Sequence, residues 1–500
     1  MWQPASNSLS LALAATLAGM SILFPAYADD YVTPLDPKTG QVLVLPEDSA
    51  LAEDATAGHP SRRPPPYTLL RYTERYSYLA DPEYPRGWLD TLKYIPLAAG
   101  NPESYLSLGG EVRERYESYH NQGFGVSGPR QNDYGLQRVL VHADLHVNER
   151  LRMFAQGISS VQFGGEFKTP INQNPLDLQQ AFIDYTWGEP TPNGERVTLR
   201  GGRFSMAYGS SRLVATRAAP NTPLKFDGVQ LIASTGGKSK LYAFAARPVE
   251  ERRYQPDTAN DEQAFYGVYA TRPLLQGLSA DLYYLGYRDE KAAYVDAAGV
   301  ENRHTIGSRW FGKTGNWDYD IEPVYQFGHI DNRDIRAWTI ASDIGYTFLQ
   351  HPWQPRVGIK MDIASGDRHQ GDGTVGTFNP LFFKAGYFND ASLLRPANIK
   401  DLHISLQAQP LENLTATLGT DAIWRFSKDD AIYATNGAIS LPADVSGTYV
   451  GTTAEGTLQW KASRHVVATL SYVHLYAGSY VKNAGGGDVD YVATWLSFLW

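Results

Sequence analysis

The sequence predicts an all-β fold: a transmembrane antiparallel up-and-down β-barrel of about 18 strands, preceded by a short N-terminal segment. Three observations support this prediction. Amphipathic stretches of about ten residues repeat from Tyr105 to the end of the chain, as expected for tilted strands that cross a bilayer. The connections between them alternate between short and long. The last ten residues, Tyr491–Trp500, contain no charge, Gly or Pro and end on an aromatic ring, which is typical of a closing barrel strand.

Residues 1–28 have the pattern of a secretory signal peptide. The apolar run Leu9–Phe24 precedes the small-residue cleavage pattern Ala26-Tyr27-Ala28, although no Lys or Arg precedes the run. No later run approaches the ~18 apolar residues that a membrane-spanning helix needs. If the mature chain lies in a membrane, it must therefore cross it as a barrel.

Two segments separate the signal peptide from the predicted barrel. Residues 29–66 are rich in Pro and lack apolar periodicity, which predicts a flexible tether. Residues 67–104 contain enough Leu, Tyr and Trp to dock, so we expect an ordered periplasmic segment packed at or inside one mouth of the barrel. The barrel itself is expected over residues 105–500, in the outer membrane and with the N-terminus in the periplasm.

The predicted strands and their connections follow a regular layout. The eighteen predicted strands are 105–119, 134–147, 151–163, 177–187, 196–206, 226–234, 239–248, 262–272, 278–288, 302–312, 317–328, 335–348, 354–365, 400–409, 414–426, 448–460, 464–477 and 489–500. Short connections such as 148–150 alternate with long ones such as 207–225 and 366–399. An even strand number with short turns at one end and longer loops at the other is typical of an outer-membrane barrel. A soluble sandwich or propeller has no reason to keep that alternation.

Alternation along each strand assigns its two faces. In the second strand Val139 and Val141 face one way, whereas Arg138 and His142 face the other. A charged side chain on the lipid face at mid-bilayer costs roughly 2–4 kcal/mol, so the charged face must point into the lumen. Among the charged residues on such inward faces, six are candidates for a substrate path: Arg113, Arg115, Arg138, Arg200, Glu322 and Glu455. The outward row of the last strand includes Phe498 and Trp500, which we expect to close the barrel.

Composition excludes several other classes of protein. The chain has no Cys, which excludes disulfides and thiolate sites, and its formal net charge of −9 argues against nucleic-acid binding. Although His142, Asp144 and His146 share a strand face, no G-x-S-x-G motif is present, and we expect neither enzymatic activity nor a cofactor. Asp367 and Asp372 lie among glycines and are weak calcium candidates, because a complete calcium hand would need a closing Glu.

Three segments resemble the alginate export family of outer-membrane porins. Together with the strand count, the resemblance covers about Tyr67 to Trp500, with Phe204 as a departure where members often carry Gln. The segments contain these motifs: Gly202-Arg203, Tyr208-Gly209, Arg212-Leu213-Val214, Arg217, Pro220-Asn221 and Phe226-Asp227-Gly228; Ser365-Gly366-Asp367, Asp372-Gly373, Thr377–Phe382 and Asn398; and Leu70-Arg71-Tyr72, Tyr76–Leu79, Asp81-Pro82 and Leu92–Leu97.

The resemblance implies passage of an anionic, alginate-like polysaccharide through an arginine-lined constriction. It adds Arg203, Arg212, Arg217 and Asp227 to the candidate path. A substrate-selective uptake porin for small organic molecules is the alternative, and Trp495 on a lumenal face suits sugars and aromatic solutes equally.

The expected partners are outer-membrane lipid and lipopolysaccharide, the barrel assembly machinery and the transported solute. We expect the chain to be a monomer.

The arginines themselves have two interpretations. If Arg113, Arg115 and Arg138 converge with the three arginines implied by the resemblance, the constriction is positive and attracts anions. If instead neighbouring acids such as Glu111, Glu117, Asp144 and Asp227 neutralise each arginine, the lumen is neutral and suited to sugar stacking. The sequence leaves both open.

Overall fold

The computed structural model describes residues 65–188, 195–235 and 239–500. The predicted signal peptide and residues 29–64 of the predicted tether lie outside the described residues. Among the described residues, no helix has the length and apolarity that a membrane span requires.

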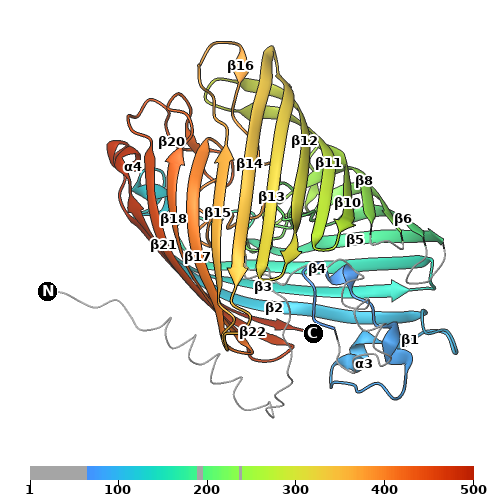
Figure 1. The fold of residues 1–500 in the computed structure, drawn as a ribbon. Coiled ribbons are helices and arrows are strands. Elements are labelled where there is room, and N and C mark those ends of the chain that lie inside the picture. Colours follow the sequence, from blue (N-terminus) through green and yellow to red (C-terminus); the bar gives the residue numbers. More distant parts are fainter. Residues whose placement is uncertain (1–64, 189–194, 236–238) are drawn as a thin grey trace.

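Within the described residues, eighteen long strands pair in chain order, each antiparallel to its neighbours, and the last pairs with the first (Figure 1). They are β2 (Tyr105–His120), β3 (Gln131–His146), β4 (Leu151–Gly164), β5 (Asn174–Gly188), β6 (Arg196–Phe204), β7 (Phe226–Ser234), β8 (Lys240–Glu250), β10 (Gln263–Leu275), β11 (Leu278–Ala293), β12 (Ala298–Thr314), β13 (Trp317–Ile330), β14 (Arg333–Thr347), β15 (Arg356–Ala364), β17 (Ile399–Leu411), β18 (Leu414–Arg425), β21 (Tyr449–Lys461), β22 (Val466–Ala477) and β23 (Val489–Leu499). The predicted closed barrel and its strand number are confirmed.

Shorter elements lie in the N-terminal segment and in the loops. They are the 3-10 helices η1 (Arg71–Thr73), η2 (Ser77–Ala80) and η3 (Gln122–Gly125), the helices α3 (Asp90–Lys93) and α4 (Ser479–Asn483), and the strands β1 (Ile95–Pro96), β9 (Thr258–Ala259), β16 (Thr374–Val375), β19 (Ile432–Tyr433) and β20 (Ile439–Leu441). β1 pairs with the start of β2, and β16 pairs in parallel with β14.

The largest difference from the predicted boundaries is in the hairpin of β11 and β12. These strands run to Ala293 and from Ala298, five residues beyond and four residues before the predicted limits of 288 and 302. The ladder continues past an irregularity between Asp289 and Ala292 to the pair Ala293 and Ala298. The extra residues include Glu290 and Lys291, so the apolar alternation stops before the hydrogen-bonded ladder does.

Side-chain exposure follows the predicted alternation. On β3, Val141 is 54% exposed while the neighbouring His142 is 3% exposed. On β15, Met361 is 51% exposed and Asp362 is 1% exposed. Apolar side chains therefore cover the outside of the barrel, and the polar and charged side chains of these strands lie in the lumen.

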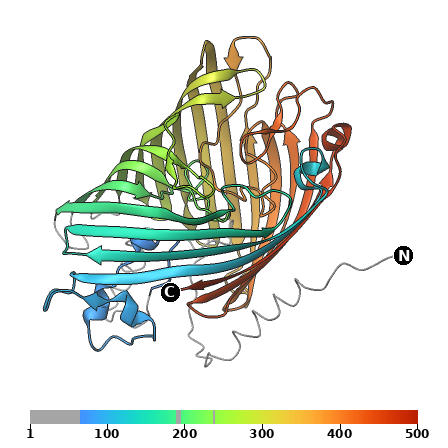
Figure 2. The ribbon, with the colours of Figure 1, turned by 180° about the vertical axis from the view of Figure 1, so that it is seen from behind.

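The seam between β2 and β23 closes the barrel (Figure 2). Phe498 lies opposite Val112, and the backbone N–H of Gly110 donates to the carbonyl of Trp500 at 2.8 Å. The Trp500 N–H donates in return to the Gly110 carbonyl at 3.1 Å. A Cβ at position 110 would lie 2.4 Å from the Trp500 ring, so only Gly lets that ring lie against the first strand.

Candidate functional site: a lumen narrowed by two loops

Two long connections meet inside the barrel. We call residues 205–225, between β6 and β7, the constriction loop, and residues 365–398, between β15 and β17, the long loop. Val214 and Phe382 form a parallel bridge between them. The Phe382 N–H donates to the Leu213 carbonyl and the Ala215 N–H donates to the Phe382 carbonyl, both at 2.9 Å. The two loops therefore form one backbone-paired unit.

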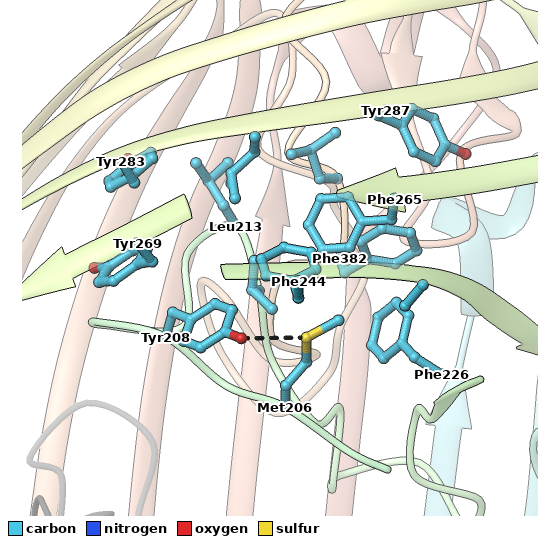
Figure 3. Close-up of a cluster of buried hydrophobic side chains, with 14 of the residues drawn as sticks. Met206, Tyr208, Leu213, Phe226, Phe244, Phe265, Tyr269, Tyr283, Tyr287 and Phe382 are labelled. Carbon is cyan, nitrogen blue, oxygen red and sulfur yellow. Dashed lines mark hydrogen bonds between the residues drawn. The ribbon is translucent and has the colours of Figure 1, made fainter. Parts of the chain in front are cut away.

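This unit is held by an aromatic cluster that fills one side of the lumen (Figure 3). Phe382 of the long loop lies 4.8 Å from Phe265 of β10 between ring centroids. Tyr208 of the constriction loop stacks on Tyr269 of the same strand at 5.1 Å, with 19° between the planes. We define the aromatic cluster as the buried side chains labelled in Figure 3: Met206, Tyr208, Leu213, Phe226, Phe244, Phe265, Tyr269, Tyr283, Tyr287 and Phe382.

On β2 and β3, three of the predicted arginines hold the tip of the constriction loop. Arg113 donates to the carbonyls of residues 218, 219 and 220 at 2.9, 3.2 and 3.1 Å. Arg115 donates to the carbonyl of residue 219 at 3.0 Å, and Arg138 donates to that of residue 218 at 2.9 Å. Three cations thus converge on three consecutive carbonyl oxygens, which accept their hydrogen bonds without cancelling their charge.

The same three arginines differ in how their charge is balanced. Arg138 pairs with Glu111 at 3.0 Å, and Arg115 pairs with Glu117 at 2.6 Å. Arg113 makes no ion pair with a described residue. One positive charge of this group is therefore left without a carboxylate in contact.

Arg212 and Arg217 of the constriction loop have different surroundings. Arg212 pairs with Glu322 at 2.7 Å and Asp320 at 2.8 Å, both on β13. Arg217 donates to the carbonyls of Leu381 and Phe383 at 3.3 and 3.1 Å, and burial lowers the pKa of its guanidinium to about 10. Both arginines fix the loops, one to the barrel wall and one to the long loop.

Arg203 and Asp227 do not lie in the lumen, which corrects the placement that followed from the family motif. They are register partners on β6 and β7 and form a two-bonded ion pair at 2.7 and 2.8 Å. Arg203 is three residues beyond the buried, lumenal Arg200, so strand alternation turns it outward, on the face of the exposed Leu199. This pair therefore braces the outer side of the barrel at the long-loop end.

The remaining predicted residues are lumenal and paired. Arg200 pairs with Asp184 at 2.8 Å. Glu455 of β21 lies 3.0 Å from the imidazole of His403 on β17. The two calcium candidates serve as turn residues, because Asp367 accepts the N–H of residue 369 at 3.0 Å and Asp372 accepts that of residue 374 at 2.7 Å. Among the described residues, no group of three or more His, Asp or Glu side chains is placed to hold a metal.

Two cavities remain beside the paired loops. The mouth cavity lies at the short-turn end, and its charged lining is Arg71, Arg113, Arg115, Arg138 and Lys461 against Glu111 and Asp390. The wall cavity lies between the long loop and strands β17 to β22. Eight of its lining residues, here called the hydroxyl wall, are Ser405, Gln407, Thr415, Thr417, Thr457, Gln459, Thr469 and Ser471.

Four residues line both cavities and mark the junction between them. They are Ala219 of the constriction loop, Asp390 of the long loop, Gln459 of β21 and Trp495 of β23. The Arg115 guanidinium lies 4.7 Å from the Trp495 ring centroid, a cation–π contact. Burial raises the pKa of the Asp390 carboxyl. The sequence predicts a lumenal position for Trp495 but not for the other three residues, because two belong to loops and Gln459 carries no charge.

Comparison with known proteins is consistent with this architecture. A family model described as alginate export matches residues 104–494, which confirms the resemblance seen in the motifs. No curated protein sequence matches the chain.

Similar solved structures show the fold alone, because their sequence identities are low. A BenF-like porin from Pseudomonas fluorescens Pf-5 superposes with a TM-score of 0.54 at 8% identity, covering 79% of this chain and 98% of that one. OccK5 (OpdH) of Pseudomonas aeruginosa gives 0.53 at 12% identity, covering 79% and 97%. OccK2 (OpdF) of the same organism, in complex with glucuronate, gives 0.52 at 10% identity, again covering 79% and 97%.

Proposed function

Since the chain belongs to the alginate export family and has the fold of an outer-membrane porin, we propose that it is a pore for an anionic, hydroxyl-rich solute of the alginate type. The family and the fold indicate a channel rather than an enzyme. We further propose that the short-turn end and the N-terminus face the periplasm, as the layout of outer-membrane barrels implies.

The observation that carries this proposal is the charge of the mouth cavity. Five cationic side chains line it against two carboxylates, and Glu74 and Glu117 pair with two of the five from behind the lining. Arg113 makes no ion pair with a described residue, so the cavity keeps an excess of positive charge. The local potential is therefore positive although the whole chain is net negative, and a carboxylate gains free energy on entry.

The wall cavity offers hydrogen-bonding groups for the hydroxyl groups of the solute. The hydroxyl wall offers Ser, Thr and Gln side chains, which donate to and accept from the hydroxyl groups of a sugar. Trp495 lies where this wall meets the cationic mouth and presents an apolar ring surface. A uronate residue carries both a carboxylate and ring hydroxyls. Its carboxylate complements the cationic mouth cavity, and its hydroxyls complement the hydroxyl wall.

A substrate-selective uptake porin for small organic molecules is the second candidate. The observation that favours it is the aromatic cluster, which fills one side of the lumen and leaves two cavities that meet at four residues. A lumen narrowed in this way can pass small solutes at least as well as a polymer. Single-channel block by uronate oligomers, compared with block by small aromatic acids, separates the two candidates.

The selectivity of the pore tests the anion proposal directly. In a planar bilayer under a KCl gradient, we expect the wild-type pore to be anion-selective and Arg113→Gln to lower the anion-to-cation permeability ratio roughly two- to fivefold. That range corresponds to the loss of about 0.5–1 kcal/mol between unit charges 4–8 Å apart in water. Arg203→Gln is the matched control, because its side chain lies outside the lumen.

Folding of each variant is checked by heat-modifiable migration on gels. A wild-type pore that is cation-selective, with Arg113→Gln unchanged in selectivity, would remove the anion preference and favour the uptake porin.

A further inference from the structure

The N-terminal segment lies before the region matched by the family model, yet it reaches the solute path. The model match begins at residue 104, whereas five earlier residues line the mouth cavity. They are Tyr67, Thr68, Leu69, Leu70 and Arg71. The segment therefore does more than approach the barrel from outside, because these five residues form part of a lumenal surface.

The first anchor of this segment is at the barrel seam. Arg71 donates to the Gly110 carbonyl at 2.9 Å and to the Trp500 carbonyl at 2.8 Å, so one guanidinium bridges the first and last strands. Glu74 pairs with Arg71 at 2.7 Å and fixes the orientation of the guanidinium. Buried, charge-assisted hydrogen bonds of this kind hold a backbone segment in a defined position.

The second anchor is the constriction loop itself. The Tyr72 hydroxyl donates to the carbonyl of Ser205, the first residue of that loop, at 2.8 Å. The Tyr72 ring meets Phe182 of β5 edge-on at 5.3 Å, and the Arg200 guanidinium lies 4.1 Å from its centroid. Tyr72 therefore connects the N-terminal segment to the loop that narrows the pore.

The third anchor is the turn between β21 and β22. The Tyr67 hydroxyl hydrogen-bonds the His465 imidazole at 3.3 Å, and Arg464 pairs with Asp90 of α3 at 3.2 Å. With anchors at both ends, residues 68–70 are held as a short span across the short-turn mouth.

We propose that Tyr67–Arg71 is a fixed wall of the pore that sets its bore and its charge at the short-turn mouth. This inference rests on the proposed function only in requiring that the barrel conduct. It holds for either solute class, because it concerns which residues border the path. Arg71, paired with Glu74, places its guanidinium at the mouth cavity, and Leu69 is half-buried and lines the same cavity.

Single-cysteine labelling tests the proposal cleanly, because the full chain contains no Cys. Leu69→Cys and Thr68→Cys are made in the full-length protein, reconstituted in planar bilayers and treated with cationic or anionic methanethiosulfonate reagents. We expect each adduct to cause a stepwise loss of single-channel current. The cationic adduct should shift the reversal potential toward anion selectivity, and the anionic adduct should shift it the opposite way.

Glu83→Cys is the matched control, since Glu83 is exposed on the same segment and lines neither cavity. It should label, by mass, without changing current or reversal potential. The proposal is overturned if Leu69→Cys and Thr68→Cys label without an electrical effect, or if neither labels in the folded, heat-modifiable barrel. A cation-selective wild-type pore would contradict the proposed function, yet the opposite shifts from the two reagents would still support this inference.

Discussion

The two sides of the lumen are built from different chemistry. On the side of β7 to β11, the loops and strands bury rings such as Phe226, Phe265 and Phe382 to 7% exposure or less. On the side of β17 to β22, hydroxyl and amide groups such as Thr415 and Thr417 border an open cavity. On the first side the packed rings fix the loops, whereas the second side leaves a cavity between the long loop and the strand wall.

The two sides differ in the free energy of removing their side chains from water. Close-packed rings gain from leaving water and from mutual contact, so the filled side resists loosening. Hydroxyl and amide groups exchange water for solute hydroxyls at little net cost. We therefore expect substitutions on the filled side to change stability and substitutions on the hydroxyl wall to change solute binding.

Phe382→Ala should have the largest effect. Phe382 contacts Phe226, Phe265 and Tyr287 and also carries the backbone pairing between the two loops. Truncating a buried Phe costs about 3–5 kcal/mol, so the free energy of unfolding in urea should fall by that amount. Open-channel noise should increase as the loops loosen. Thr417→Ala on the hydroxyl wall is the control, and an equal loss of stability in both variants would contradict the comparison.

A pH dependence of intermediate size should come from the N-terminal segment, which contacts the filled side through Tyr72. Burial and the neighbouring Arg71 lower the pKa of Lys93 to about 7 from an ordinary 10.5. Between these values the unfolded chain binds more protons than the folded chain, so stability should rise with pH, by up to about 1.4 kcal/mol per unit. Below pH 7 both states are protonated and the contribution is constant.

The measurement is the urea midpoint of wild type and of Lys93→Met at pH 6.5, 8 and 9.5. The wild-type midpoint should rise across this series, and the Lys93→Met profile should be flatter. Parallel profiles would show that the Lys93 ammonium is not desolvated where it meets the Leu108 carbonyl.

Thr469→Val should have the smallest effect on stability and a selective effect on transport. Thr469 lines the wall cavity, and its buried hydroxyl has no hydrogen-bond partner among the described residues. Replacing it with an isosteric methyl should change the unfolding free energy by less than about 1 kcal/mol. The dwell time of a uronate oligomer in single-channel block should shorten, while block by a small aromatic acid should not. Equal dwell times for the oligomer would remove the hydroxyl wall from the path.

The sequence by itself determined the barrel, its strand number, the closing strand and the lumenal face of strands such as β3. These follow from a period of two and from the cost of a charge facing lipid, and both act locally along the chain. Val141 and His142 are assigned to opposite faces without any knowledge of their neighbours. The family motifs added Arg212 and Arg217, whose side chains fix the two loops, and Arg203, which strand alternation places outside.

Only the tertiary structure decided what the lumenal charges contact. Arg113 and Arg138 meet carbonyls about 80 to 105 residues away, on a loop whose path no local pattern specifies. The same holds for Phe382, whose ring is an ordinary loop residue in the sequence and the centre of a packed cluster in the fold. The direction in which a side chain points is a local property of its strand. Whether its charge is paired depends on distant chain segments, which meet only when the barrel closes around its loops.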